Sequence, residues 1–390
     1  MHAAPPQEDP AFLQEQIVTY LGNKRHLLGF IGSGVQEVQR RLGRSGLSCL
    51  DAFSGSGVVA RYLKSVAAEL YVNDLEPYAE VINRCYLANR GAVDAAGLAA
   101  LHAEFCRRVE ATLAPGPVAE LYAPRDDAHI ARGERVFYTR RNAEYIDTAR
   151  RLADTLPPEM QPFFLAPLLY EASVHTNTSG VFKGFYKNAE GVGQFGGTGR
   201  NALQRILAPI RLPLPVFSRF ECPCHILRGD AAQVAASLPQ LDLAYIDPPY
   251  NQHPYGSNYF MLNFILNPHT GREFSKVSGI PQDWNRSDFN SRRKVQQAFT
   301  ALLDCLPARF VLVSYNSEGF LTRAEMAALL ERFGRVDVQE TDYAAFRGSR
   351  NLASRNLRVK EYLFLLERPA LPNPKSLPSH SAPVAERQPA

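Results

Sequence analysis

The stretch LDLAYIDPPY, residues 241–250, places a short apolar run directly before an acid, two prolines and a tyrosine. An apolar run of this length that ends in a turn is typical of a strand buried on both faces of a parallel sheet. Because proline has no amide donor and cannot extend a strand, we expect the strand to end at Asp247. Parallel sheets bind their ligands at the carboxyl ends of the strands, so Asp247 is a candidate site residue.

Five further apolar runs predict strands, and helix-like stretches follow four of them. The strands are expected at 47–53, 69–74, 225–230, 309–316 and 361–367, and the helices at 57–67, 76–90, 231–238 and 322–333. The alternation of strand and helix predicts an α/β fold with a mostly parallel sheet that is covered by helices on both faces.

Residues 91–224 interrupt this alternation with helical patches and a glycine-rich, aromatic segment at 175–203. Structureless loops of such length are rare in compact proteins, so we expect an inserted domain. The resulting organisation is a loose arm at 1–15, a first part of the sheet domain at 16–90, the inserted domain at 91–224, a second part of the sheet domain at 225–367 and a disordered tail at 368–390.

The composition is that of a globular protein, with 45% hydrophobic and 21% charged residues over 390 positions. No apolar run approaches the roughly 18 residues that cross a bilayer, and the start lacks a secretory pattern, which favours a cytoplasmic protein without membrane contact. The six cysteines are scattered and suit reduced thiols. Cys222 and Cys224 beside His225 could form half of a zinc site, but no second half follows at usable spacing, so no metal is expected.

The stretch DAFSGSG, residues 51–57, ends a predicted strand and opens a helix. Glycines there let the backbone pass close to a ligand, although a simple tight turn would use them equally well. The third glycine of the dinucleotide fingerprint is absent, so the loop is expected to bind a nucleoside or an amino acid rather than a pyrophosphate. For the same reason a nicotinamide oxidoreductase is disfavoured.

Further polar residues follow other strands or turns. Asp74 and Glu76 end the second strand and could accept the two hydroxyls of a ribose or cap the next helix. Asp230 could accept from an adenine amine or cap the helix after it. Lys24 follows a glycine turn and could pair with a carboxylate or remain solvated.

Chemistry on a nucleobase amine explains the Asp-Pro-Pro-Tyr turn. The lone pair of such an amine is delocalised into the ring, and two acceptors aimed at its hydrogens would localise the pair and stabilise the positive charge that develops on nitrogen. The Asp247 carboxylate and a backbone carbonyl held by the prolines would supply these acceptors. Tyr250 would stack on the base, which has to leave the duplex to be reached.

Six motifs in chain order resemble those of the DNA adenine methylase family, the Dam-like amino-methyltransferases that use S-adenosylmethionine. They are YLGNKR (20–25), DAFSGSG (51–57), NDLEP (73–77), LRGD (227–230), YIDPPY (245–250) and VLVSYN (311–316). The resemblance spans roughly residues 17 to 366 and places the insert where this family carries its target recognition.

The resemblance implies a Rossmann-like methyltransferase sheet with an antiparallel final strand within 361–367. It also implies methylation of the 6-amino group of adenine in double-stranded DNA by base flipping. The implied catalytic residues are Asp247, Pro248 and Tyr250. The implied cofactor contacts are Tyr20, Gly22, Lys24, Asp51, Phe53, Gly55, Asp74 and Asp230.

Three segments are locally basic, at 132–141, 285–294 and 347–360. The last has five cations and no acid, which suits contacts to DNA phosphates, although a charge run is often only solvated surface. The expected phosphate contacts are Arg347, Arg350, Arg355, Arg358 and Lys360.

Other functions remain open at this point. Methylation of the 4-amino group of cytosine uses the same amine chemistry, RNA offers the same base edge, and a relative without activity could keep the fold. We expect a monomer that acts in a restriction–modification or host-marking role, with a cognate restriction endonuclease as a possible partner.

Overall fold

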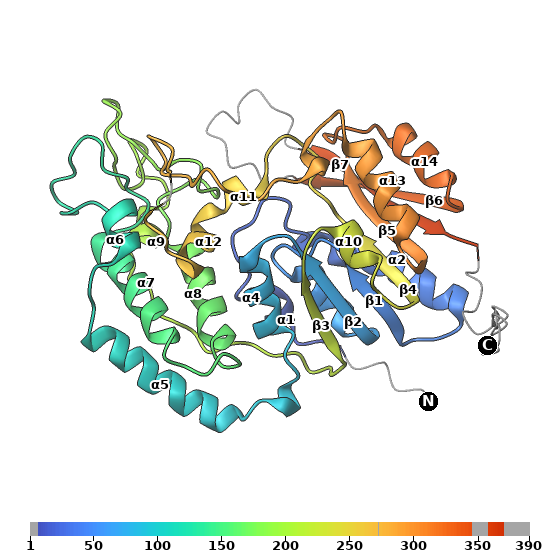
Figure 1. Ribbon diagram of the computed structural model, residues 1–390, viewed down its shortest axis with the longest axis horizontal. Helices are drawn as coiled ribbons and strands as arrows, with labels where there is room; N and C mark the ends of the chain where they lie inside the picture. The colour runs from blue at the N-terminus through green and yellow to red at the C-terminus, as the bar shows by residue number, and fades with distance from the viewer. Residues whose placement is uncertain (1–6, 272, 345–357, 370–390) are drawn as a thin grey trace, which may run out of the picture.

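The protein is described by a computed structural model that covers residues 7–271, 273–344 and 358–369. Its centre is a seven-stranded sheet with the strand order β3-β2-β1-β4-β5-β7-β6 (Figure 1). The strands are β1 Leu47–Asp51, β2 Ala67–Asp74, β3 Cys224–Arg228, β4 Leu241–Ile246, β5 Ala308–Asn316, β6 Arg335–Ala344 and β7 Arg358–Glu367.

Strands β1 to β5 pair in parallel, and β7 runs antiparallel between β5 and β6. The prediction of a mostly parallel sheet with an antiparallel final strand is therefore confirmed. Because β7 runs against its neighbours, its first residues lie at the carboxyl edge of the parallel strands. Glu361, for example, is in register with Asn316, the last residue of β5.

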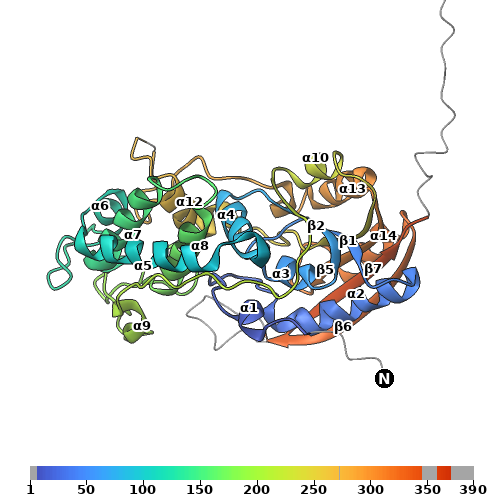
Figure 2. The same cartoon turned by 90° about the horizontal axis from the view of Figure 1, so that it is seen from below.

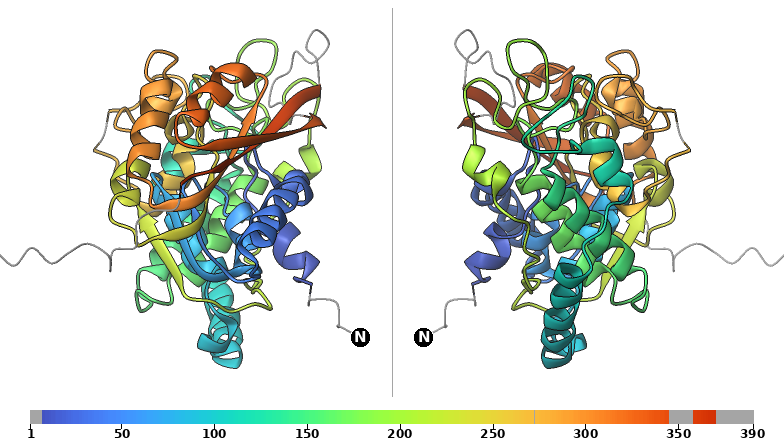
Figure 3. Two further views of the ribbon diagram at one scale, coloured as in Figure 1. Left: turned by 90° about the vertical axis from the view of Figure 1, so that its right-hand side faces the viewer. Right: turned by 90° about the vertical axis from the view of Figure 1, so that its left-hand side faces the viewer.

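Strand β4 is apolar except at Asp242, because helices cover both of its faces. Leu243 and Tyr245 pack on one face with α2 (Leu28–Leu42) and α3 (Val58–Lys64). Ala244 and Ile246 pack on the other face with α10 (Ala231–Ala235), α13 (Val295–Cys305) and α14 (Arg323–Glu331). Figures 2 and 3 show these two helical layers on opposite sides of the sheet.

A helical lobe lies at one end of the molecule (Figure 1). We use this name for α5 Ala95–Ala111, α6 Pro117–Tyr122, α7 Arg140–Ala153, α8 Pro162–Val174, α9 Leu203–Leu207 and α12 Phe260–Leu266. Its core is continuous with residues of α4 (Pro77–Tyr86), which follows β2. Helix α12 comes from the second part of the chain, and Phe260 and Phe264 both contact the Tyr122 ring. The lobe thus contains more than the predicted insert.

The two ends of the insert meet beside the sheet. The Asn89 side-chain amide donates to the Cys222 carbonyl at 3.0 Å, and the Cys222 backbone amide donates to the Asn89 side-chain oxygen at 3.3 Å. We call this pair the clasp. It lies just before β3, where Leu70 of β2 is in register with Cys224.

Residues 7–15 are not a loose arm, contrary to our expectation. Helix α1 (Pro10–Gln14) is capped by Asp9, and its Phe12 side chain is buried. The fully buried Arg61 guanidinium donates to the carbonyls of Phe12, Glu15 and Gln16. Buried hydrogen bonds of this kind fix the backbone that accepts them. Residues 370–390, where we expected a disordered tail, lie outside the described residues.

The remaining short helices are η1 Arg25–Leu27, η2 Arg90–Ala92, α11 Tyr255–Asn258 and η3 Asp288–Asn290. Within the described residues, no helix combines the length and the apolar character that a membrane crossing requires.

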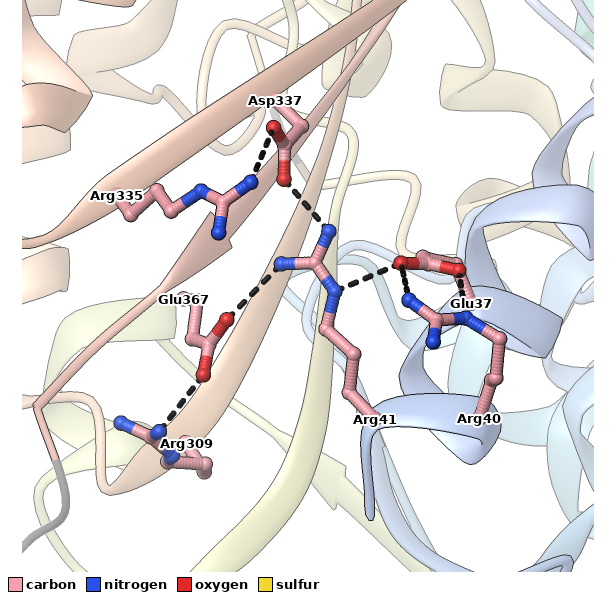
Figure 4. A network of polar contacts seen from close by, with 7 residues as sticks. All are labelled: Glu37, Arg40, Arg41, Arg309, Arg335, Asp337 and Glu367. Carbon is pink, nitrogen blue, oxygen red and sulfur yellow. Dashed lines mark hydrogen bonds and ion pairs between the residues drawn. The ribbon is translucent and has the colours of Figure 1, made fainter. Parts of the chain in front are cut away.

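Ion pairs connect the end of α2 to the last two strands (Figure 4). Arg41 donates to Glu37 at 2.8 Å, to Asp337 of β6 at 2.6 Å and to Glu367 of β7 at 2.9 Å. Arg309 of β5 also donates to Glu367, at 2.8 Å. The side chain of Arg41 is only 16% exposed, so these ion pairs are expected to contribute more to stability than ordinary surface pairs.

Candidate active site

A cavity lies at the carboxyl edge of the parallel strands and encloses about 890 Å³, part of it open to solvent. All eight residues predicted as cofactor contacts line it together with Asp247: they are Tyr20, Gly22, Lys24, Asp51, Phe53, Gly55, Asp74 and Asp230. Pro248 and Tyr250 are not among the lining residues, although Pro249 is.

The glycine-rich loop after β1 forms one wall of the cavity. Gly55 has φ +49°, and a Cβ atom there would lie 3.0 Å from the Tyr20 ring. Gly57 has φ +77° and leads directly into α3. Residues with a side chain rarely adopt such backbone angles, so both glycines are required by the turn.

Asp74 holds this loop against the end of β2. One carboxylate oxygen accepts from the Gly55 backbone amide at 2.7 Å, and the other accepts from the Glu76 amide at 2.9 Å. Asp74 therefore shapes the cavity as well as lining it. Asp230 combines two roles in the same way, because it lines the cavity and caps α10 by accepting from Ala232 and Gln233.

Glu76 is buried in the cavity wall, with 4% of its surface exposed. Its carboxylate accepts from the side-chain amides of Asn263, at 2.6 Å, and Asn285, at 3.2 Å. Burial, followed by the nearby Asp74 carboxylate, raises the pKa of Glu76 to about 7. A group with this pKa changes its charge near neutral pH.

Asp51 is fully buried at the end of β1. Neither of its carboxylate oxygens accepts a hydrogen bond of full geometry within the described part of the chain, although the backbone amides of Phe53 and Ala60 lie near enough to moderate its pKa. Burial, and then the nearby Asp247 carboxylate, raises the pKa of Asp51 well above its ordinary value. A buried carboxylate in a cavity wall whose oxygens are not fully hydrogen-bonded marks a position where a ligand can donate.

Asp247 follows β4 directly, as the sequence predicts, and its side chain is 15% exposed. Its carboxylate lies 3.2 Å from Lys24 Nζ, so Lys24 does pair with a carboxylate. Burial raises the pKa of Asp247 to about 6, and Lys24 opposes this rise. Lys24 Nζ also lies 3.9 Å from Glu361 of β7, a residue that our sequence analysis did not single out.

Three tyrosine rings stack near the Asp-Pro-Pro-Tyr turn, residues 247–250. The Tyr20 ring lies 4.9 Å from the Tyr255 ring and 4.5 Å from the Tyr259 ring, nearly parallel to both. The Tyr250 ring instead packs edge-on against Tyr315, with 5.9 Å between the centroids. Only Tyr20 of the stacked rings was predicted.

The segment after the Asp-Pro-Pro-Tyr turn supplies six lining residues that lie outside every motif singled out in the sequence. They are Tyr255, Gly256, Asn285, Ser287, Phe289 and Asn290. The sequence marked 285–294 only as basic, because no strand or turn pattern connects this segment with the strand ends.

The predicted phosphate contacts fall mostly outside the described residues. This is true of Arg347, Arg350 and Arg355, while Arg358 begins β7 without a described side chain. Lys360 is half exposed and pairs with Glu340 of β6 at 2.7 Å.

A parallel sheet with an antiparallel seventh strand, and an Asp-Pro-Pro-Tyr turn at the edge of its cavity, define an α/β methyltransferase. Within this class, residues 20–328 match the model of the D12 class N6 adenine-specific DNA methyltransferases, and the chain belongs to this family.

Similar proteins agree with this assignment. The chain is 27% identical to the type II methyltransferase M.NlaIII of Neisseria lactamica over 362 residues, which are 90% of this chain and 99% of the relative. It is 28% identical to the type II methyltransferase M.CviAII of Paramecium bursaria Chlorella virus 1, over 90% of this chain and 98% of the relative. It is also 25% identical to the modification methylase StsI of Streptococcus sanguinis, over 92% of this chain and 53% of the relative. The prediction of an enzyme that methylates adenine in DNA is confirmed.

Proposed function

We propose that the protein transfers the methyl group of S-adenosylmethionine to the 6-amino group of an adenine flipped out of duplex DNA. The observation that carries this proposal is the position of Asp247. Its carboxylate lines the same cavity as the glycine-rich loop and lies at the end of β4, the central strand of the sheet.

The charges of the cavity suit S-adenosylmethionine. Five carboxylates line it, those of Asp51, Asp74, Glu76, Asp230 and Asp247, and Lys24 is the cation among its lining residues. A cavity with this balance favours a ligand that carries positive charge. Bound S-adenosylmethionine supplies an electrophilic methyl group on a positively charged sulfur atom.

Two carboxylates are the best candidates for direct contacts to this cofactor. Asp51 has two buried oxygens that can accept from its ammonium group. Glu76 is a stronger candidate for the ribose hydroxyls than Asp74, because each oxygen of Asp74 already accepts a backbone amide. Gly55 allows the backbone to approach the ligand closely.

The Asp-Pro-Pro-Tyr turn, residues 247–250, is called the catalytic turn in this proposal and acts on the adenine amine. The Asp247 carboxylate and the Pro248 carbonyl accept hydrogen bonds from the two amine hydrogens. The nitrogen lone pair is then available to form the bond to the methyl carbon, whose bond to sulfur breaks. The nitrogen loses one proton as this bond forms, and Asp247 is the group placed to accept it. Tyr250 provides a ring on which the flipped base stacks.

The insert at 91–224 is proposed to read the target sequence. Its glycine-rich segment contacts α11, the helix that follows the catalytic turn in the chain, since the Phe182 backbone amide donates to the Asn258 carbonyl at 2.8 Å. Asn177 organises the segment: it is fully buried, donates to Val136 and Gln194, and accepts from the Gly196 amide. Loops held in this way can present side chains to DNA with a defined geometry.

The cellular role is proposed from the relatives. Two of them are type II methyltransferases that align with this chain over almost their whole length. We propose that the protein acts in the cytoplasm as a monomer and protects host DNA, with a restriction endonuclease of the same specificity as its partner. Modification-sensitive sequencing of DNA from a host that expresses the protein would identify the base and the site together.

The variant Asp247→Ala tests the catalytic proposal. We expect it to abolish tritium transfer from labelled S-adenosylmethionine to DNA while the cofactor affinity, measured by calorimetry, stays within a few-fold of wild type. Asp304→Ala on the exposed side of α13 is the matched control and should change neither quantity. A variant of Asp247 that retained transfer would exclude the catalytic role.

A further inference from the structure

Glu361 is a buried acid near the catalytic turn that the proposed transfer does not use. It lies on β7, and its side chain is 3% exposed. One carboxylate oxygen accepts from the Asn316 side chain at 3.4 Å, and the other accepts no hydrogen bond from the described residues. An ionised carboxylate is costly to bury unless a cation is near, so a charged Glu361 requires a cation among its neighbours.

Among the described residues, Glu361 pairs with the cation Lys24, which it shares with Asp247. Lys24 Nζ lies 3.2 Å from the Asp247 carboxylate and 3.9 Å from that of Glu361, and the Lys24 side chain is 3% exposed. Burial alone would lower the pKa of Lys24, but the two carboxylates raise it well above its ordinary value. Lys24 therefore remains charged and lies between two acids that share its charge.

We propose that Glu361 is a positioning residue of the methyl transfer, which holds Lys24 between two carboxylates and thereby keeps Asp247 a strong proton acceptor. This proposal rests on the proposed catalytic role of Asp247. Without Glu361, Lys24 would pair with Asp247 alone, and a carboxylate that is fully paired with a cation accepts a proton less readily.

Other ionisable groups also face Asp247 and are left unchanged by a substitution at Glu361. They are Asp51 at the end of β1, Tyr245 in β4, Tyr250 in the catalytic turn and Tyr255 in α11. Tyr250 also lies near Glu361 and Lys24. Because the groups interact, the rate is expected to follow the apparent pKa of the cluster.

The test is the pH dependence of the single-turnover rate with saturating cofactor and DNA. In the wild type, the rate should rise as Asp247 ionises, around pH 6. In Glu361→Gln, which keeps the shape and removes the charge, this rise should move to lower pH by roughly one unit, because a like charge raises the pKa of its neighbour. The rate at pH 8 should fall several-fold, and Glu361→Asp, which keeps the charge, should restore most of it.

Glu367→Gln is the matched control, because it makes the same change on the same strand within the ion pairs of Figure 4. It should alter stability and leave the position of the pH rise unchanged. A rise at the wild-type pH in Glu361→Gln would overturn the proposal, whatever the rate. Asp247→Ala distinguishes a failure of this proposal from a failure of the proposed function. Activity in that variant would refute the catalytic role of Asp247 and not merely the effect of Glu361.

Discussion

Asp51, Glu76 and Asp247 all have pKa values that burial raises, and all three line the same cavity. Such a group holds its proton more tightly in the folded chain than in the unfolded chain. Its contribution to stability is present at low pH and is lost as the pH rises through the folded pKa. At neutral pH these carboxylates weaken the fold, and a positively charged ligand would offset the effect.

Replacement of Glu76 makes this cost measurable. Glu76→Gln should raise the free energy of unfolding at pH 8 by about 1–3 kcal/mol, since the pKa rise to about 7 is removed. At about pH 3, where the wild-type carboxyl is protonated in both the folded and the unfolded chain, the difference should disappear. Urea denaturation at both pH values measures it.

The same variant should bind cofactor at least tenfold more weakly if Glu76 accepts the ribose hydroxyls. Glu80→Gln is the matched control, because Glu80 pairs with Arg84 and Arg228 and does not line the cavity. Equal cofactor affinity in the two variants would remove Glu76 from the binding site.

A pair of glycines separates backbone strain from contact with the cofactor. Gly55 and Gly43 both have positive φ, but a Cβ atom meets the Tyr20 ring only at Gly55, and at Gly43 nothing lies within 4 Å. Each alanine variant should lose about 1–2 kcal/mol of stability from the left-handed backbone. Calorimetry should show at least tenfold weaker cofactor binding for Gly55→Ala and unchanged binding for Gly43→Ala; equal affinities would contradict the loop assignment.

At the scale of residues, the sequence predicts the site where a strand leads directly into it. Asp51, Asp74 and Asp247 follow apolar runs, so their position at the sheet edge could be inferred. Glu361 and Asn285 could not be inferred, because an antiparallel strand and an irregular segment bring them to the cavity. Their partners are distant in the chain and leave no local pattern.

At the scale of elements, Arg41 attaches β6 and β7 to α2. Arg41→Ala should lower the free energy of unfolding by about 1–3 kcal/mol, because three carboxylates lose a half-buried partner. Arg40 pairs only with Glu37 in Figure 4, and its side chain is 71% exposed, so Arg40→Ala should leave the free energy of unfolding nearly unchanged. Chemical denaturation of the two variants at one salt concentration gives the comparison, and equal losses would show that the pairs to β6 and β7 contribute nothing.

Elements were predicted where burial leaves a simple pattern. Strand β4 is apolar on both faces because both faces are covered. Strand β6, RVDVQETDYA, was missed because it is an edge strand with many polar positions. Helix α8 was also missed: it is apolar all round because the lobe surrounds it, and Pro167 lies within it. Neither feature has the alternation on which sequence analysis depends.

At the scale of the whole molecule, the helical lobe shares one apolar core with α4, the helix that follows β2 of the sheet. Tyr78 and Ile82 of α4 belong to the same buried cluster as residues of α5, α7, α8 and α12. The sequence predicted an insert, but it could not show that α12 returns to pack against it. The lobe is therefore expected to unfold together with the sheet.

This expectation can be tested with the single tryptophan of the chain, Trp284. Trp284 lies in the irregular segment beside the cavity, with the Arg286 guanidinium 4.4 Å from its ring centroid. Urea denaturation followed by Trp284 fluorescence and by far-ultraviolet circular dichroism should give coincident transitions, as one cooperative unit requires. Two separated midpoints would show that the lobe is an independent unit.

The clasp between Asn89 and Cys222 has a consequence for how such enzymes diversify. The entropy of closing a loop grows only with the logarithm of its length, by about 0.6 kcal/mol for each doubling. Because β2 and β3 already pair where the clasp closes, a segment of another length can be exchanged there at small thermodynamic cost. An exchanged segment that keeps an apolar surface against Tyr78 and Ile82 leaves the strand ends untouched. Under the recognition role proposed for the insert, new target sequences can therefore evolve while the transfer chemistry is inherited unchanged.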